Sequence, residues 1–171
     1  LNLYNTGLTG EIPSTIWNLI NLQFLDLGYN QLYGNIHSDL CNLINLEWLE
    51  LGSNEFIGQI PQCIGNLTNL NRLSLEFNQL SGDIPSSIGE LINLTSLNLG
   101  INQLTGEIPV ELWNLINLTT LHLGYNQFTG DIHPGIGNLT NLVQLWLNSN
   151  NLSGSFPSEI GNLTNLVQLW I

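Results

Sequence analysis

Basic residues are almost missing from this chain of 171 residues, which has one of them, Arg72, against thirteen acidic residues. The formal net charge is −12. Binding to nucleic acids or to anionic membrane surfaces requires clustered Lys or Arg, so we expect neither kind of partner. Cations, basic peptides and neutral glycans remain compatible with this charge.

Long apolar runs are missing as well. Asn interrupts every apolar run well short of the roughly 18 residues that a membrane span needs, so we expect no membrane insertion. Hydrophobic residues still make up 43% of the chain, which is enough for a core, and the length suits one domain.

The apolar residues return with a fixed period of 24 residues and no insertion. An Asn-Leu pair recurs at 21–22, 45–46, 69–70, 93–94, 117–118, 141–142 and 165–166. In each period two further apolar residues, an Asn, a Gly and in most periods a Pro follow at constant spacing. One unit therefore reads L-x-x-L-x-L-x-x-N-x-L-x-G-x-I-P.

This unit resembles the leucine-rich-repeat family, and specifically its plant-type class with the signature L-T-G-x-I-P, which is complete at residues 104–109. The resemblance covers the whole chain. It implies an α/β fold, a right-handed curved solenoid with a parallel sheet on the concave face and short 3₁₀-like helical turns on the convex face. It also implies one domain over residues 1–171, with about seven repeats and no recognisable terminal caps.

Local patterns agree with this expectation. Leu25-Asp26-Leu27 alternates apolar and polar residues, as a half-buried strand does. The run from Ile16 to Leu22 has apolar residues at 16, 19, 20 and 22, which predicts a helical turn. A single coil cannot bury its own leucines, so we expect stability to come from contacts between neighbouring coils.

Two asparagine columns run through the repeats. We expect the first to bridge the backbones of adjacent coils, because an unpaired buried amide would cost roughly 1–3 kcal/mol. Its members are Asn30, Asn54, Asn78, Asn102, Asn126 and Asn150, with Thr6 in the first coil. The second column, Asn21 to Asn165, is expected to be buried and to bond backbone groups before each strand.

The side chains between the strand leucines are predicted to point to the concave face, which in this family is the usual binding surface. Aromatic residues gather there, and Trp and Tyr are typical interface anchors. Acidic residues gather toward one end, which would suit a basic ligand. The candidate ligand-binding residues are Phe24, Asp26, Tyr29, Trp48, Glu50, Arg72, Glu76, Phe77, His122, Tyr125, Trp146 and Trp170.

We expect no enzyme, no catalytic residues, no metal site and no cofactor. His37 and His133 replace the motif proline four repeats apart, or roughly 19 Å at about 4.8 Å per strand, too far to share one metal ion. No Ser or Cys has a paired base. A regular surface without inserted loops offers no deep, dry pocket.

Two kinds of covalent modification stay open. Cys41 and Cys63 fall in adjacent coils, where we expect their Cα atoms to come within about 6 Å of each other, so either a disulfide or two free thiols fits. The sequence has six N-glycosylation motifs, and we expect Asn66, Asn138 and Asn162 to be the exposed acceptors. Asn93 and Asn117 belong to the second column and are expected to be inaccessible.

Three functions compete. The first is an extracellular or cell-surface module that recognises a protein or peptide. The second is a structural or adhesive element that stacks on itself, because the uncapped ends expose sheet edges and residues 137–146 repeat at 161–170. The third is a surface that faces glycans or ice, on evenly spaced Thr and Asn.

Overall fold

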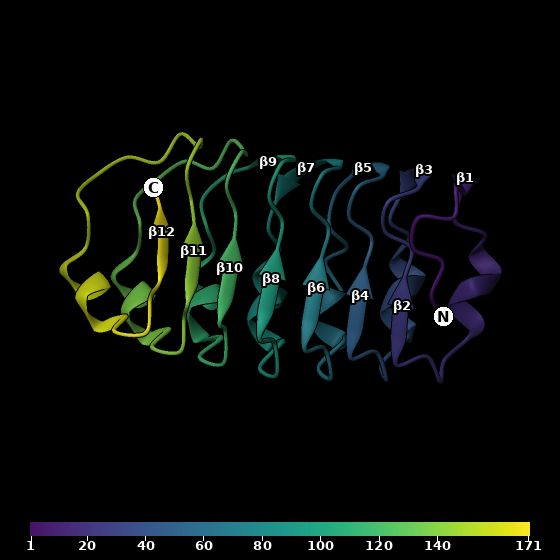
Figure 1. The fold of residues 1–171 in the computed structure, drawn as a ribbon, viewed down its shortest axis with the longest axis horizontal. Coiled ribbons are helices and arrows are strands. Elements are labelled where there is room, and N and C mark those ends of the chain that lie inside the picture. The colour runs from purple at the N-terminus through teal and green to yellow at the C-terminus, as the bar shows by residue number, and fades with distance from the viewer.

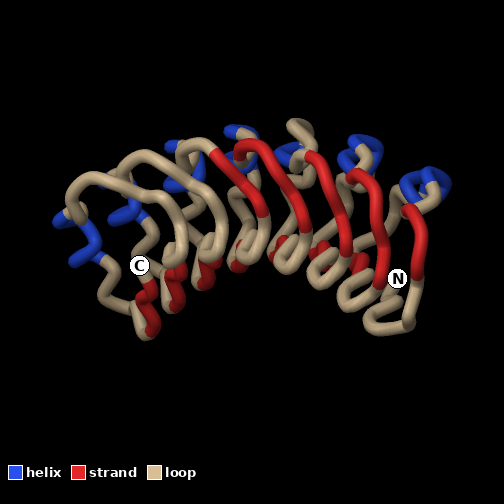
Figure 2. The backbone as a smooth tube through the Cα atoms, turned by 90° about the horizontal axis from the view of Figure 1, so that it is seen from above, coloured by secondary structure: helices blue, strands red, loops and turns tan.

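The computed structural model describes all of residues 1–171 and shows a curved stack of similar coils (Figure 1). Each coil contributes one strand to a seven-stranded parallel sheet whose order follows the chain. These strands are β2 (Phe24–Asp26), β4 (Trp48–Glu50), β6 (Arg72–Ser74), β8 (Ser96–Asn98), β10 (Thr120–His122), β11 (Gln144–Trp146) and β12 (Gln168–Trp170). The predicted strand at Leu25 is thus confirmed, and the sheet lies along the inner side of the arc (Figure 2).

The register of this sheet repeats without a slip. Leu25, Leu49 and Leu73 face one another across successive strands, as do Leu97, Leu121, Leu145 and Leu169. Residues one period apart therefore form continuous columns across the sheet. These leucines, except Leu169 in the last strand, belong to a single hydrophobic cluster of 40 buried residues.

A second parallel sheet was not predicted. It consists of β1 (Thr9–Glu11), β3 (Gln31–Asn35), β5 (Glu55–Gly58), β7 (Gln79–Asp83) and β9 (Gln103–Thr105). Isolated bridges, Glu107 with Thr129 and Asp131 with Ser153, continue the pairing. Each of these segments is short and contains or precedes a glycine with positive φ, which is typical of a turn. No alternation of apolar and polar residues is long enough there to predict a strand.

The outer side of the arc carries seven short 3₁₀ helices (Figure 2). They are η1 (Ser14–Asn18), η2 (Ser38–Asn42), η3 (Ile64–Asn66), η4 (Ser86–Glu90), η5 (Val110–Asn114), η6 (Pro134–Asn138) and η7 (Ser158–Asn162). The predicted helical turn at 16–22 was placed too late, since η1 ends at Asn18. Residues 19–22 form a separate turn that leads into β2.

The first asparagine column is a hydrogen-bonded ladder, as predicted. Asn78 is typical: its Nδ2 donates to the carbonyls of Leu51, Leu75 and Glu76, and its Oδ1 accepts from the Phe56 amide. In the first coil the Thr6 hydroxyl donates to the Leu3 carbonyl at 2.8 Å, in place of the missing amide.

The second asparagine column is exposed, so the expectation that it is buried was wrong. Its bonding was predicted correctly: each member from Asn45 to Asn165 donates from Nδ2 to a carbonyl of the preceding coil at 2.8–2.9 Å. Asn93 and Asn117 are therefore accessible. Bonding to an exposed carbonyl does not require burial, and the sequence pattern does not distinguish the two cases.

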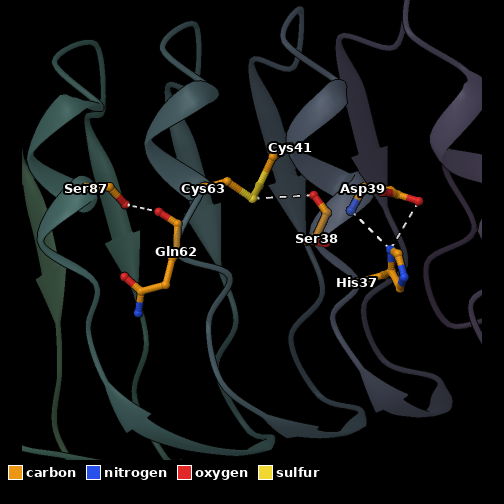
Figure 3. The surroundings of a disulfide bond; sticks show 7 residues. All are labelled: His37, Ser38, Asp39, Cys41, Gln62, Cys63 and Ser87. Atoms are coloured by element: carbon orange, nitrogen blue, oxygen red, sulfur yellow. Dashed lines mark hydrogen bonds and ion pairs between the residues drawn. A yellow bond between two sulfur atoms is a disulfide. The ribbon is translucent and has the colours of Figure 1, made fainter.

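Cys41 and Cys63 form a disulfide, with Cα atoms 5.9 Å apart (Figure 3). The bridge joins η2 to the residue that precedes η3. Around it, the Ser87 hydroxyl donates to the Gln62 carbonyl at 2.7 Å, and His37 Nδ1 accepts from the Asp39 amide at 3.1 Å. The bridge thus fastens two adjacent coils on the outer side.

Candidate functional site

Two columns of side chains cover the seven-stranded sheet on its concave face. The first column is Phe24, Trp48, Arg72, Ser96, Thr120, Gln144 and Gln168. The second column is Asp26, Glu50, Ser74, Asn98, His122, Trp146 and Trp170. Of the twelve predicted site residues, the strands hold Phe24, Asp26, Trp48, Glu50, Arg72, His122, Trp146 and Trp170.

The other four predicted residues, Tyr29, Glu76, Phe77 and Tyr125, lie in the turns that follow the strands. The three aromatic residues have φ of 51–58° and exposed side chains, so they stand at the margin of the sheet. The prediction that they lie within the strands was wrong. The sequence did not show that the backbone turns sharply there.

An aromatic and cationic stack covers the first strands. The rings of Phe24 and Trp48 are stacked with centroids 5.3 Å apart, and the Arg72 guanidinium lies 4.6 Å from the Trp48 ring. The same guanidinium is 3.6 Å from Glu50 Oε2. Arg72, the single basic residue, is thus held between a ring and a carboxylate.

Three acidic side chains beside this stack are held by hydrogen bonds. The Gly28 amide donates to Asp26 at 3.0 Å, the Gly52 amide donates to Glu50 at 3.1 Å, and Asn98 donates to Glu76 at 2.5 Å. Burial raises the pKa of the Glu50 carboxyl, although the Gly52 amide and the Arg72 charge act in the opposite direction. Asn98 was missing from the predicted site residues, because only the register places its amide beside Glu76.

A second aromatic group covers the last strands. His122 stacks on Trp146 with ring centroids 3.9 Å apart, and Trp170 is tilted against Trp146 at 5.9 Å. Burial lowers the pKa of His122, and the Arg72 charge acts in the same direction. The imidazole is therefore uncharged at neutral pH and forms part of a neutral aromatic surface. Small polar residues, Ser96, Asn98 and Thr120, separate the two aromatic groups.

Several concave polar atoms are covered but have no hydrogen-bond partner within the protein. They are Trp48 Nε1, Arg72 Nε and Trp146 Nε1. Buried polar groups are rarely left unpaired, but the buried indole N–H groups of Trp17 and Trp113 on the outer side are unpaired too, so these atoms do not by themselves mark a binding site.

The concave face lies apart from the main cavity of the molecule. No three His, Cys, Asp or Glu side chains are placed to hold a metal ion. The largest cavity, about 600 Å³, lies elsewhere and is lined by residues that include Glu107, Asp131, His133 and Phe156. None of the predicted site residues lines it.

Family models of the leucine-rich repeat match residues 1–19, 21–43, 45–67, 69–91 and 93–115, and a model of two such repeats matches 116–159. The chain belongs to the leucine-rich repeat family. No curated protein sequence matches it significantly.

Solved leucine-rich-repeat structures include close matches from plants. The plant peptide hormone receptor RGFR1, in complex with RGF2, is 44% identical with a TM-score of 0.95 over 97% of this chain. The Arabidopsis receptor kinase HAESA, in complex with the peptide hormone IDA and the co-receptor SERK1, is 38% identical with a TM-score of 0.95 over 99% of this chain. The chain spans 27% and 29% of these two proteins.

A plant ice-binding protein is also similar. It is 30% identical with a TM-score of 0.82, and the match covers 94% of this chain and 55% of that protein. These comparisons confirm the repeat class and the predicted fold. No helix of this chain is long and apolar enough to cross a membrane.

Proposed function

We propose that this leucine-rich repeat chain is an extracellular binding module that holds a peptide or an extended protein segment along its concave face. The observation that carries the proposal is the pair of aromatic groups, Phe24–Trp48–Arg72 and His122–Trp146–Trp170, at the two ends of one regular surface. Aromatic side chains and Arg are the usual anchors of interfaces. The similar plant receptors that bind peptide hormones, and the disulfide, which is typical of secreted proteins, support it.

The charge of the first group favours a ligand with a basic residue. Asp26, Glu50 and Glu76 carry three negative charges against the single positive charge of Arg72, and their carboxylates are already oriented by hydrogen bonds. Oriented acceptors strengthen a charge-assisted hydrogen bond because little ordering is left to do on binding. We therefore place a Lys or Arg of the ligand near Glu50 and Glu76.

Selection from a random peptide library against the purified chain tests this function. Selected peptides should lose binding to the Trp48→Ala and Trp146→Ala variants by at least about tenfold, in the range of interface anchors. Trp113→Phe, a change of a buried indole on the outer side, is the control. Peptides that bind both concave variants as well as the unchanged chain would place the site elsewhere.

The basic residue has its own test. Replacing the Arg of a selected peptide by citrulline should weaken its binding to the unchanged chain about tenfold. The same replacement should weaken binding to the Glu76→Gln variant much less. Glu90→Gln makes the same charge change on η4, away from the sheet, and should leave the citrulline effect intact. An equal effect in all three proteins would show general charge attraction only.

Self-association is a further proposal for this chain. The motive is the regularity of the coils: residues 137–146 repeat without change at 161–170, and identical coils can pair in the same parallel register in which β10, β11 and β12 pair within the chain. Light scattering over a concentration series should show growth beyond the monomer mass, and a constant monomer mass would contradict it.

We also propose ice binding as a second candidate function. The similar plant ice-binding protein motivates it, and the charge-poor, evenly repeated polar residues of this chain support it. The concave face does not suit an ice surface, because aromatic and acidic side chains interrupt its columns. Inhibition of ice recrystallisation by the purified chain tests this function directly, and no inhibition would exclude it.

A further inference from the structure

A second regular surface lies at the turns between the 3₁₀ helices and the strands of the seven-stranded sheet. These turns follow one another along one margin of the molecule, the lower margin in Figure 1. Two exposed columns run along it. One is Ile20, Ile44, Thr68, Ile92, Ile116, Thr140 and Thr164, and the other is the seven-membered asparagine column from Asn21 to Asn165. We call these two columns the turn edge.

Hydrogen bonds between coils fix the turn edge. The Nδ2 of Asn45 donates to the Ile20 carbonyl, and the same bond recurs at every later coil up to Asn165 and the Thr140 carbonyl, always at 2.8–2.9 Å. Each bond uses one amide hydrogen, so every Asn still presents a carbonyl oxygen and one N–H to solvent. The amides are therefore ordered before anything binds.

The turn edge has apolar groups, amides and no charge. Ile20, Ile44, Ile92 and Ile116 are 54–60% exposed. The fourteen positions, two columns of seven, hold four Ile, three Thr and seven Asn. The column at the helix ends beside it, Asn18 to Asn162, is also Asn except at Glu90.

This composition does not fit a protein partner. Protein interfaces concentrate their binding energy in a few aromatic or Arg anchors within a polar rim, and the turn edge has no aromatic residue and no Arg. It offers instead the same weak contact repeated at one spacing, near the roughly 4.8 Å of paired strands. Repeated weak contacts on a rigid surface sum to useful affinity only when the partner has a matching periodic structure. Because the turn edge carries no charge, it suits a partner that is itself uncharged.

We infer that the turn edge binds ice through its isoleucine and threonine methyl groups and its fixed asparagine amides. This inference rests on the second function proposed above, and it assigns that function to a face separate from the concave peptide surface. The methyl groups would displace loosely held water, and the amides would bond to the ordered lattice.

The Ile92→Lys and Ile116→Lys double variant tests the assignment. Both side chains are exposed, so the fold should survive, but an ammonium group pressed against a neutral lattice loses hydration without gaining a partner. Val110→Lys makes the same change at an exposed β-branched residue of η5, away from the turn edge. The proteins should be produced in a bacterium, so that the glycosylation motifs near the edge stay unmodified.

The readouts are inhibition of ice recrystallisation and adsorption of the fluorescently labelled chain to a single ice crystal. We expect the double variant to need at least about tenfold more protein for equal inhibition, a factor that corresponds to about 1.4 kcal/mol, with Val110→Lys unchanged. Circular dichroism should show all three proteins equally folded.

Two results would overturn the inference in different ways. If the unchanged chain has no activity on ice, the second function itself is wrong. If it is active and the double variant is equally active, ice binds on another face and only the assignment to the turn edge is wrong.

Discussion

At the scale of single residues, the asparagine ladder is the most constrained feature of the chain. Each member donates to carbonyls of two coils and accepts an amide of the preceding coil, and no other residue type of similar size has both donors and an acceptor. The ladder therefore satisfies backbone groups that neither sheet reaches.

Asn78→Ala should lower the free energy of unfolding by about 3 kcal/mol, because it removes one accepted bond and the two amide hydrogens shared among three carbonyls, at about 1 kcal/mol for each bond. Asn42→Ala is the matched control, since Asn42 is an exposed amide at the end of η2. Urea unfolding measures both. Equal losses in the two variants would mean that the ladder contributes nothing beyond helix and surface effects.

Ile101 has a left-handed backbone conformation, which is unfavourable for isoleucine. Its φ is 55°, which a β-branched side chain rarely adopts, and its equivalents include Asn5 in the first coil. Ile101→Asn should raise the free energy of unfolding by about 1 kcal/mol, by relieving strain in the left-handed region. Ile92→Asn, a like change at an exposed position, should give no such gain, and a destabilised Ile101→Asn would contradict the explanation.

His122 should make the stability depend on pH. Its folded pKa lies below the ordinary 6.5, so below pH 6.5 the unfolded chain takes up a proton that the folded chain refuses. The contribution of His122 to the free energy of unfolding is fully present above pH 6.5 and is lost as the pH falls through the pKa of the folded state. His122→Gln should therefore lose less stability over this interval than the unchanged chain.

Glu50 acts with the opposite sign. Its raised pKa contributes stability below the ordinary 4.5 and loses it as the pH rises through the folded pKa. Urea unfolding gives the free energy of unfolding of the unchanged chain and of His122→Gln at each pH. The difference between the two values removes the Glu50 contribution, because both proteins contain Glu50. Identical pH slopes would show that His122 is not shielded from water in the folded chain.

At the scale of elements, the sequence predicted the inner strands well and the other elements less well. Leu25 and Leu27 are separated by a single residue, as is the corresponding pair in every coil. The alternation of apolar and polar residues is therefore visible even though the strands have only three residues. Four of the five strands of the second sheet contain a glycine, and the fifth, β9, is followed directly by Gly106, so these segments show no strand-like alternation. The 3₁₀ helices begin before Ile16, because Pro13 and its equivalents mark the helix start more strongly than the apolar spacing does.

The disulfide between η2 and η3 is the element-scale feature that the sequence left undecided. Closing a loop of 22 residues restricts the unfolded chain, so a Cys41→Ser and Cys63→Ser double variant should lose about 3 kcal/mol of unfolding free energy. Adding a reductant should destabilise the unchanged chain and leave the double variant unaffected. If reductant changes neither protein, the cysteines are not paired in solution.

At the scale of the whole molecule, the fixed period made the candidate site predictable. One register error would have moved every concave residue to the core, and none occurred, because Leu49 and Leu73 repeat the position of Leu25 without insertion. The contacts within the site were not predictable. The Arg72 position over Trp48 and the His122 stack on Trp146 depend on rotamers and local curvature, which a repeat pattern does not specify.

The whole molecule thus presents two surfaces of different character. The concave face is aromatic and acidic and varies from coil to coil, as a surface that discriminates between ligands does. The turn edge is neutral and nearly identical from coil to coil. The five tryptophans divide between the concave strands, which carry Trp48, Trp146 and Trp170, and the 3₁₀ helices, in which Trp17 and Trp113 are buried.

The five indole N–H groups therefore provide the most direct test of the concave face as the ligand surface. A library-selected peptide is titrated into the ¹⁵N-labelled chain, and the five indole signals are followed by NMR. We predict saturating shifts of the Trp48 and Trp146 signals, with the Trp17 and Trp113 signals unchanged. Shifts confined to Trp17 and Trp113, or no indole shift at saturation, would contradict the proposal that the peptide lies along the concave face.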